Sequence, residues 1–160
     1  MRAQQFRVHV VRPTLQHLAL WSPAAEILVL GTALHESAGL TFLDQITGPG
    51  DVTLGPAFGL YQIEPKTHDD LFEHTLAFHT GRREALMQLA GAWPSRHLQL
   101  VTNLGYATAV ARLLFWRAKP PLPAADDLEG LAVYWKTFFN TAAGKGTVDE
   151  WLLHYRTFGG

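Results

Sequence analysis

The chain has 160 residues, of which 48% are hydrophobic and 17% charged, so it is long and apolar enough to form one folded domain over residues 1–160 without covalent cross-links. Its formal net charge of −1 gives no basic field to attract nucleic acid or an anionic membrane surface, and we expect neither as a partner. The absence of cysteine excludes disulfides, thiolate nucleophiles and cysteine-ligated zinc.

The beginning of the chain lacks the pattern of an export signal. Arg7, His9, Arg12 and Pro13 interrupt its apolar stretch, whereas a signal peptide needs a sustained apolar core. The most apolar run, residues 24–34, is about half of the ~20 residues that a membrane span needs. We therefore expect neither a signal peptide nor a membrane-spanning helix.

That apolar run predicts a buried central helix. Ser22 is a good N-cap and Pro23 suits the first helical position. Gly39 can adopt the left-handed conformation that commonly follows a helix, which predicts an end near Ser37 or Ala38.

The segment around residues 40–60 differs from the apolar run in its amino-acid composition. It is crowded with glycine and proline and also holds Thr41, Phe42, Val52 and Thr53. This composition predicts an irregular insert or a small β-hairpin.

The rest of the chain reads as helical. Pro65 can open one helix, a second begins around Arg82, and residues after Ser95 predict one long helix through Trp116. After the prolines of segment 120–123, helices are expected over residues 126–138 and after Thr147. The predicted fold class is all-α with a small insert.

Glu36 is the first candidate for chemistry. It ends the apolar helix, where the partial negative charge of the helix terminus disfavours an ionised carboxylate, and the nearby core would disfavour it further by desolvation. Both effects raise the pKa, and a carboxylic acid that is protonated near neutral pH can donate to a glycosidic oxygen. The alternative interpretation is a solvated glutamate at a helix end.

The second candidate is the segment from Gly59 to Pro65. Gly59 permits close approach of the backbone to a ligand, Tyr61 has a stacking face, and Gln62 offers both a donor and an acceptor to sugar groups. The alternative is a glycine-rich turn with Tyr61 and Ile63 in the core.

Together these two motifs resemble the soluble lytic transglycosylase and goose-type lysozyme superfamily. The family pattern is Glu-Ser at a helix end, then Gly-Leu-Met-Gln with an apolar residue and often proline, then Tyr-Asn-Ala-Gly. This chain has Glu36-Ser37, Gly-Leu-Tyr-Gln at 59–62, and Phe139-Asn140 followed by Thr-Ala-Ala-Gly. The resemblance implies a lysozyme-like fold and covers mainly residues 22–65.

The resemblance also implies roles for particular residues. Glu36 would be the catalytic acid, and Asn140 would frame the opposite wall of a glycan cleft. Phe139 stands where the family has a tyrosine whose hydroxyl can orient the acid, and Tyr134 is a possible substitute. The implied substrate-binding residues are Ser37, Gly59, Leu60, Tyr61, Gln62, Tyr134, Phe139 and Asn140.

The implied activity is cleavage of the MurNAc–GlcNAc β-1,4 bond of peptidoglycan. Asp44 and Asp51 are the carboxylates between Glu36 and Gln62. Either, at about 6.5–9.5 Å from Glu36, could activate water for inverting hydrolysis. We favour the route in which Glu36 acts alone and a 1,6-anhydro ring forms, because aspartates in such loops more often form turns.

Other functions were weighed against this one. His35-Glu36 lacks the following histidine of a zinc protease helix, and His68, His74 and His79 are interpreted as solvated side chains, so no metal or other cofactor is expected. The main alternative is a non-catalytic glycan-binding or virion assembly module with the same fold.

The resemblance extends to phage-encoded members of the superfamily. With no signal peptide expected, the chain would be virion-associated, or cytoplasmic before release, and would act at the bacterial cell wall. Its expected partners are peptidoglycan glycan strands and other phage virion or lysis proteins.

Overall fold

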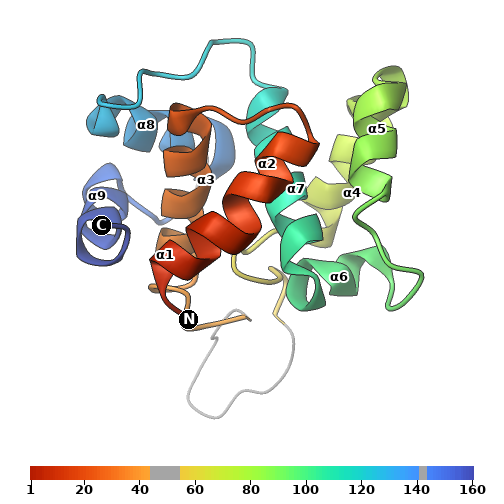
Figure 1. The fold of residues 1–160 in the computed structure, drawn as a ribbon, viewed down its shortest axis with the longest axis horizontal. Helices are drawn as coiled ribbons and strands as arrows, with labels where there is room; N and C mark the ends of the chain where they lie inside the picture. Colours follow the sequence, from red (N-terminus) through yellow and green to blue (C-terminus); the bar gives the residue numbers. More distant parts are fainter. Residues whose placement is uncertain (44–54, 141–143) are drawn as a thin grey trace.

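The computed structural model describes residues 1–43, 55–140 and 144–160, and helices account for most of them (Figure 1). The predicted all-α class is confirmed. The central element is α3 (Pro23–Glu36), which packs against the N-terminal helices, α7, α8 and α9. No helix in the described ranges is long and apolar enough to cross a membrane.

Helix α3 begins as the sequence predicts. The Ser22 hydroxyl oxygen accepts a hydrogen bond from the Ala25 backbone N–H at 3.1 Å, and Pro23 occupies the first turn. Residues 24–34 are buried except for the half-buried Ile27, so the helix is held by packing on almost every side.

The end of α3 is a tight reversal of the chain. Gly39 has φ +77°, as expected, and its neighbours Ala38 and Leu40 also have positive φ. The backbone N–H of Gly39 donates to the Leu34 carbonyl at 2.8 Å, which closes the helix end. Glu36 is therefore the last residue of a rigid helix, followed at once by a sharp turn.

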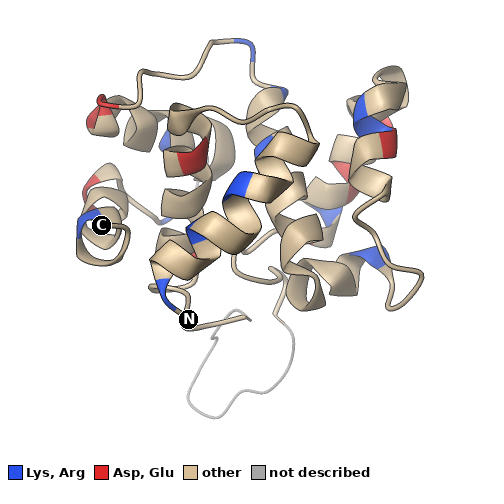
Figure 2. Cartoon of the chain, viewed as in Figure 1, with Lys and Arg blue, Asp and Glu red and all other residues tan. Residues whose placement is uncertain are grey.

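An N-terminal helical segment, which the sequence analysis did not predict, lies across α3. It comprises α1 (Ala3–Phe6), the π-helical turn η1 (Arg7–Val11) and α2 (Arg12–His17). Arg12 donates two hydrogen bonds to the buried Glu26 carboxylate, at 2.8 and 2.9 Å, and the Trp21 indole donates a third at 2.7 Å. Figure 2 shows these basic helices beside the acidic first turn of α3.

The prediction of one long helix ending at Trp116 is wrong. The segment forms α6 (Arg96–Thr102) and α7 (Leu104–Trp116), separated by Asn103 in an extended conformation. The Asn103 side chain accepts from the Tyr106 N–H at 2.9 Å and donates to the Leu89 carbonyl at 2.9 Å. These side chain–backbone bonds compete with the continuous helix, which is why an asparagine can divide an otherwise regular apolar pattern.

The remaining predicted helices are found in place, though not at every boundary. They are α4 (Pro65–His74), α5 (Thr80–Met87), α8 (Leu128–Trp135) with its continuation η3 (Lys136–Asn140), and α9 (Val148–Phe158). The short 3₁₀ helix η2 (Leu76–Phe78) was not predicted. Thr147 caps α9 in a reciprocal capping box with Glu150, whose carboxylate accepts from the Thr147 N–H at 2.8 Å.

The insert predicted for residues 40–60 can be judged only in part, because residues 44–54 lie outside the described ranges. Phe58 and Ile63 form an isolated antiparallel bridge with two backbone hydrogen bonds of 3.0 and 3.1 Å. Between them Gly59 has φ +72°, and a Cβ at this position would lie 1.9 Å from the Leu100 carbonyl oxygen of α6. Glycine is therefore required for the turn to pack on α6.

The contact between α3 and α9 depends on another glycine. A Cβ on Gly31 would lie 2.0 Å from the ring of the fully buried Trp151. We expect Gly31→Ala to lower the free energy of unfolding by about 1–3 kcal/mol, because the indole and α9 must shift. Urea denaturation measures this change.

The matched control is Gly81→Ala in α5, where an added Cβ meets no heavy atom within 4 Å. It should raise stability by about 0.5–1 kcal/mol, as alanine does in an unobstructed helix. Equal effects of the two substitutions would contradict the proposed packing of α3 on α9.

Candidate active site

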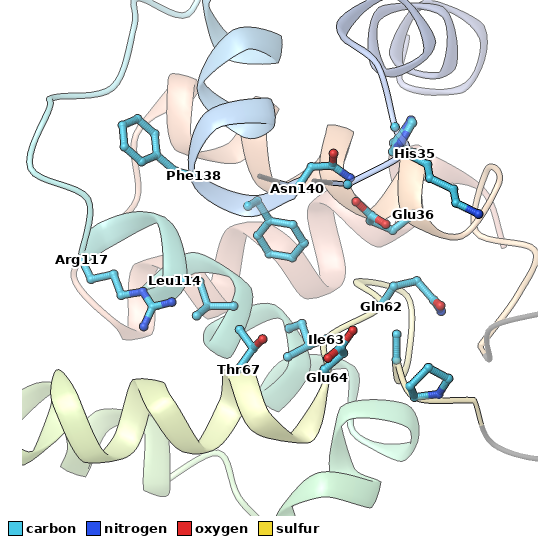
Figure 3. A pocket seen from close by; sticks show the side chains of 16 residues that line it. His35, Glu36, Gln62, Ile63, Glu64, Thr67, Leu114, Arg117, Phe138 and Asn140 are labelled. Carbon is cyan, nitrogen blue, oxygen red and sulfur yellow. The ribbon is translucent and has the colours of Figure 1, made fainter. Parts of the chain in front are cut away.

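A cleft of about 620 Å³ opens beside the end of α3. One wall is formed by His35 and Glu36 of α3, by η3 and by residues 144–146. The opposite wall comes from segment 56–67, and Leu114 and Arg117 lie at the end of α7. Figure 3 shows Glu36 and Asn140 facing Gln62, Glu64 and Thr67 across this space.

Glu36 lies in the cleft wall, and its carboxyl group is largely buried. Burial raises its pKa from 4.5 to about 7, and one hydrogen bond from the Trp135 indole N–H to Oε1, at 3.3 Å, partly offsets this effect. The Trp135 side chain is itself completely buried. The protonated and ionised forms of Glu36 are therefore both populated near neutral pH.

His35 packs on the indole that contacts Glu36. Its ring lies edge-on to Trp135 with the centroids 4.5 Å apart, and its Nδ1 lies 3.1 Å from Nδ1 of His154 on α9. Burial, together with the neighbouring His154, lowers the His35 pKa to about 4. His35 is consequently neutral at neutral pH and supplies no positive charge that would hold Glu36 ionised.

Gly146 closes this group of rings from the other side. A Cβ there would lie 2.7 Å from Nε2 of His35 and 2.8 Å from the Trp135 ring. The segment before α9 can therefore approach His35 and Trp135 closely only because it carries glycine at this position.

Asn140 is positioned in the cleft by a lysine that the sequence analysis did not identify. Lys136 donates from Nζ to the Asn140 amide oxygen at 2.6 Å and to the Gly144 carbonyl at 2.8 Å. This pair of bonds ties η3 to the segment before α9. It also fixes the orientation of the amide, whose NH₂ group remains the donor that Asn140 can offer to a ligand.

Gln62 and Glu64 contribute polar groups to the opposite wall. Gln62 has φ +48°, and its Nε2 donates to the Gly59 carbonyl at 2.8 Å, which holds the side chain at the turn. Glu64, immediately before α4, also lines the cleft and is exposed. Glu64 was not among the expected second carboxylates, which lie between Glu36 and Gln62 in sequence.

Five of the predicted substrate-binding residues do not line the cleft, namely Tyr61, Leu60, Gly59, Ser37 and Tyr134. Tyr61 is buried, its hydroxyl lies 3.0 Å from Thr108 Oγ1 and burial raises its pKa, so its ring has no free stacking face. Leu60 lies in the same core, while Gly59 faces the backbone of α6 rather than a ligand. This is the core interpretation that the sequence left open for Tyr61.

Ser37 is the fourth of these residues. Its hydroxyl donates to the Ala33 carbonyl at 2.6 Å and accepts from the Leu40 N–H at 3.0 Å. Its side chain is buried and serves the helix end on which Glu36 sits. Ser37 therefore stabilises the helix end that carries Glu36 and does not face a ligand.

Of the other predicted site residues, some line the cleft and some do not. Phe139 and Asn140 both line the cleft, and the Phe139 ring stacks on Phe115 of α7 with centroids 5.2 Å apart. Tyr134 does not substitute for the family tyrosine whose hydroxyl orients the acid. Its hydroxyl lies outside the cleft and donates to the Pro120 carbonyl at 2.8 Å. Asp44 and Asp51 lie outside the described residues, as do the three residues between Asn140 and Gly144.

No family model, no curated protein and no solved structure matches this chain.

The raised pKa of Glu36 makes the stability of the protein depend on pH. The folded chain holds this proton more tightly than the unfolded chain, so stability is lost as pH rises from about 4.5 to about 7. The substitution Glu36→Gln removes the titration. We expect the variant to gain roughly 3 kcal/mol over the parent between pH 4 and pH 8, because each pKa unit corresponds to about 1.4 kcal/mol.

Urea denaturation of both proteins at the two pH values measures this gain, and subtraction cancels the other titrating groups. A stability difference that does not change between pH 4 and pH 8 would show that the Glu36 carboxyl has an ordinary pKa.

Proposed function

We propose that this chain is a peptidoglycan muramidase that cleaves the MurNAc–GlcNAc β-1,4 bond with Glu36 as its general acid. The observation that carries this proposal is a glutamic acid with a pKa of about 7 at one wall of an open polar cleft. The oxygen of a glycosidic bond leaves only if it is protonated, and a donor with a pKa near the working pH is the most effective one.

We propose further that Glu36 serves both halves of a transglycosylation. It first donates its proton to the bridging oxygen as the bond to the muramic acid C1 breaks. The resulting carboxylate then takes the proton of the C6 hydroxyl as O6 bonds to C1, which closes a 1,6-anhydro ring and returns Glu36 to its acid form. A pKa of about 7 suits both steps, since neither form is strongly favoured near neutral pH.

The surroundings of Glu36 support a single-acid mechanism. The neutral His35 and the indole of Trp135 supply no charge beside it. Asn140 can donate to a carbonyl or hydroxyl of a sugar, and Gln62 retains its amide oxygen as an acceptor across the cleft. N-acetylated sugars carry hydroxyl and amide groups that match this set.

The place of action follows as a further proposal. The chain would act at the bacterial cell wall as part of a virion or with other phage lysis proteins, as its resemblance to phage-encoded members of the superfamily implies.

The first test compares the parent with Glu36→Gln on purified peptidoglycan. The amide keeps the size of the side chain but cannot donate a proton, so we expect release of muropeptides to fall by about 10²–10⁴-fold. Mass spectrometry of the parent digest should show anhydro-muramic ends, and circular dichroism should show an unchanged fold.

Three results separate the alternatives. Reducing-end products from the parent would identify a hydrolase. Binding to peptidoglycan without cleavage would identify the non-catalytic module. Undiminished release by Glu36→Gln would show that the acid lies elsewhere.

A second test asks whether another carboxylate takes part. Asp44→Asn, Asp51→Asn and Glu64→Gln should each retain most of the activity, because none of these groups handles the proton in a single-acid reaction. The rate of clearing of a peptidoglycan suspension measures this. Loss of turnover in any one of them, with retained substrate binding, would instead indicate a base that activates water.

A further inference from the structure

Three potential metal ligands converge at a place outside the proposed catalytic cleft. His68 and Asp69 lie on α4, and His97 lies in the first turn of α6. Their nearest ligand atoms all lie within 4.8 Å of one another, although His97 is almost thirty residues from His68 in sequence. None of the three lines the cleft beside Glu36.

The two distances from Asp69 are close to those between ligands of a tetrahedral metal site, and all three ligand atoms lie within 4.8 Å of one another. Asp69 Oδ1 lies 3.0 Å from His68 Nδ1 and 2.7 Å from His97 Nε2. Ligand atoms around Zn²⁺, with bonds of about 2.0–2.1 Å, are separated by roughly 3.3 Å in tetrahedral geometry. Small side-chain shifts would therefore allow one ion to replace the protons that now link these groups.

His68 has the outer partner that a metal-binding imidazole usually has. Its second ring nitrogen, Nε2, lies 2.7 Å from the hydroxyl of Tyr106 on α7, and both side chains are buried. When Nδ1 binds an ion, Nε2 carries the proton and donates it to the Tyr106 hydroxyl oxygen. This contact fixes the ring orientation and leaves Nδ1 directed at Asp69 and His97.

Solvent can reach the ligand group. A surface pocket of about 220 Å³ is lined by the three ligands together with Ser95 and Arg96. The Arg96 guanidinium lies over the Phe72 ring, 4.7 Å from its centroid, which gives this cation a resting position on an aromatic face. The pocket provides an entry path and space for a fourth ligand.

We propose that His68 Nδ1, Asp69 Oδ1 and His97 Nε2 bind one Zn²⁺ ion, with the fourth position open to water or to an exogenous ligand. Two imidazoles and one carboxylate are donors that Zn²⁺ accepts, and three protein ligands with an open position form a site accessible to solvent. The ion would link α4 to α6. Because Glu64 and Thr67 of the cleft wall lie at the start of α4, the ion would also stabilise that wall.

Isothermal titration calorimetry of the chelator-treated full chain with zinc chloride tests this proposal. We expect one ion per chain at submillimolar Zn²⁺ and a higher midpoint of thermal unfolding when it binds. His97→Ala and Asp69→Asn should each weaken the affinity at least tenfold. Both side chains are partly exposed, so neither substitution opens a buried cavity.

Two further variants separate a built site from nonspecific binding to histidine. His74→Ala is the matched control, because His74 pairs with Asp70 on the same helix at 3.1 Å but lies outside the group of three. It should leave the affinity unchanged. Tyr106→Phe removes only the outer hydroxyl and should weaken Zn²⁺ binding about 10-fold.

The proposal fails if the parent binds no Zn²⁺ at millimolar concentration, since the three side chains would then form a hydrogen-bond network alone. It also fails if His97→Ala and Asp69→Asn bind as tightly as the parent, or if His74→Ala weakens binding as much as they do. None of these outcomes bears on Glu36.

Discussion

The burial of one carboxyl group at the end of α3 is the constraint on which the rest of this site depends. An ionised carboxylate placed there loses much of its hydration and gains one hydrogen bond, from the Trp135 indole. The protonated form is therefore more strongly favoured than it is for a solvated glutamate, and the acid retains its proton up to about pH 7. The same desolvation acts in the opposite sense on His35 and keeps that base neutral. Glu36 and His35, which are adjacent in sequence, are thus both held in their uncharged forms.

Three separate parts of the chain maintain this environment. Helix α3 supplies Glu36, α8 supplies the indole of Trp135, and the glycine at 146 lets the segment before α9 pack closely on Trp135 and His35. Helix α9 is held against α3 by the contact between Trp151 and Gly31. Stability and chemistry are linked here, because α9 also carries His154, whose Nδ1 lies 3.1 Å from Nδ1 of His35, the neighbour of Glu36.

Local signals in the sequence predicted the starts of α3 and α9 correctly. Ser22 and Thr147 cap α3 and α9 through hydrogen bonds within one turn of the chain. A few neighbouring residues are therefore enough to predict where these helices begin. The division at Asn103 was missed because the apolar spacing continues across it, although the Asn103 side chain caps α7 locally through the Tyr106 N–H and also donates to the distant Leu89 carbonyl. The N-terminal helices were missed as well, since Glu26, which anchors them, lies in another helix.

The sequence predicted several residues of the candidate site through the recognised motifs. Glu36, Gln62 and Asn140 all line one cleft, as the motif order indicated. Tyr61 and Ser37 belong to the same motifs but face the interior, and no feature of their local sequence distinguishes the two orientations. Trp135 contacts the acid from a position 99 residues away in sequence, so only the fold could reveal this contact. Lys136 lies four residues before Asn140, and this helical spacing was the local signal that could have identified it.

The central claim is that the fold keeps the Glu36 carboxyl protonated up to about pH 7. Carbon-13 NMR of the protein labelled at glutamate side-chain carboxyls, with Glu36→Gln to assign the resonance, measures this titration directly. The account predicts a midpoint for Glu36 near 7, well above the usual 4.5 of a glutamate. A midpoint between 4 and 5 would contradict it, because the carboxyl would then be solvated and ionised at neutral pH and could not serve as the proton donor.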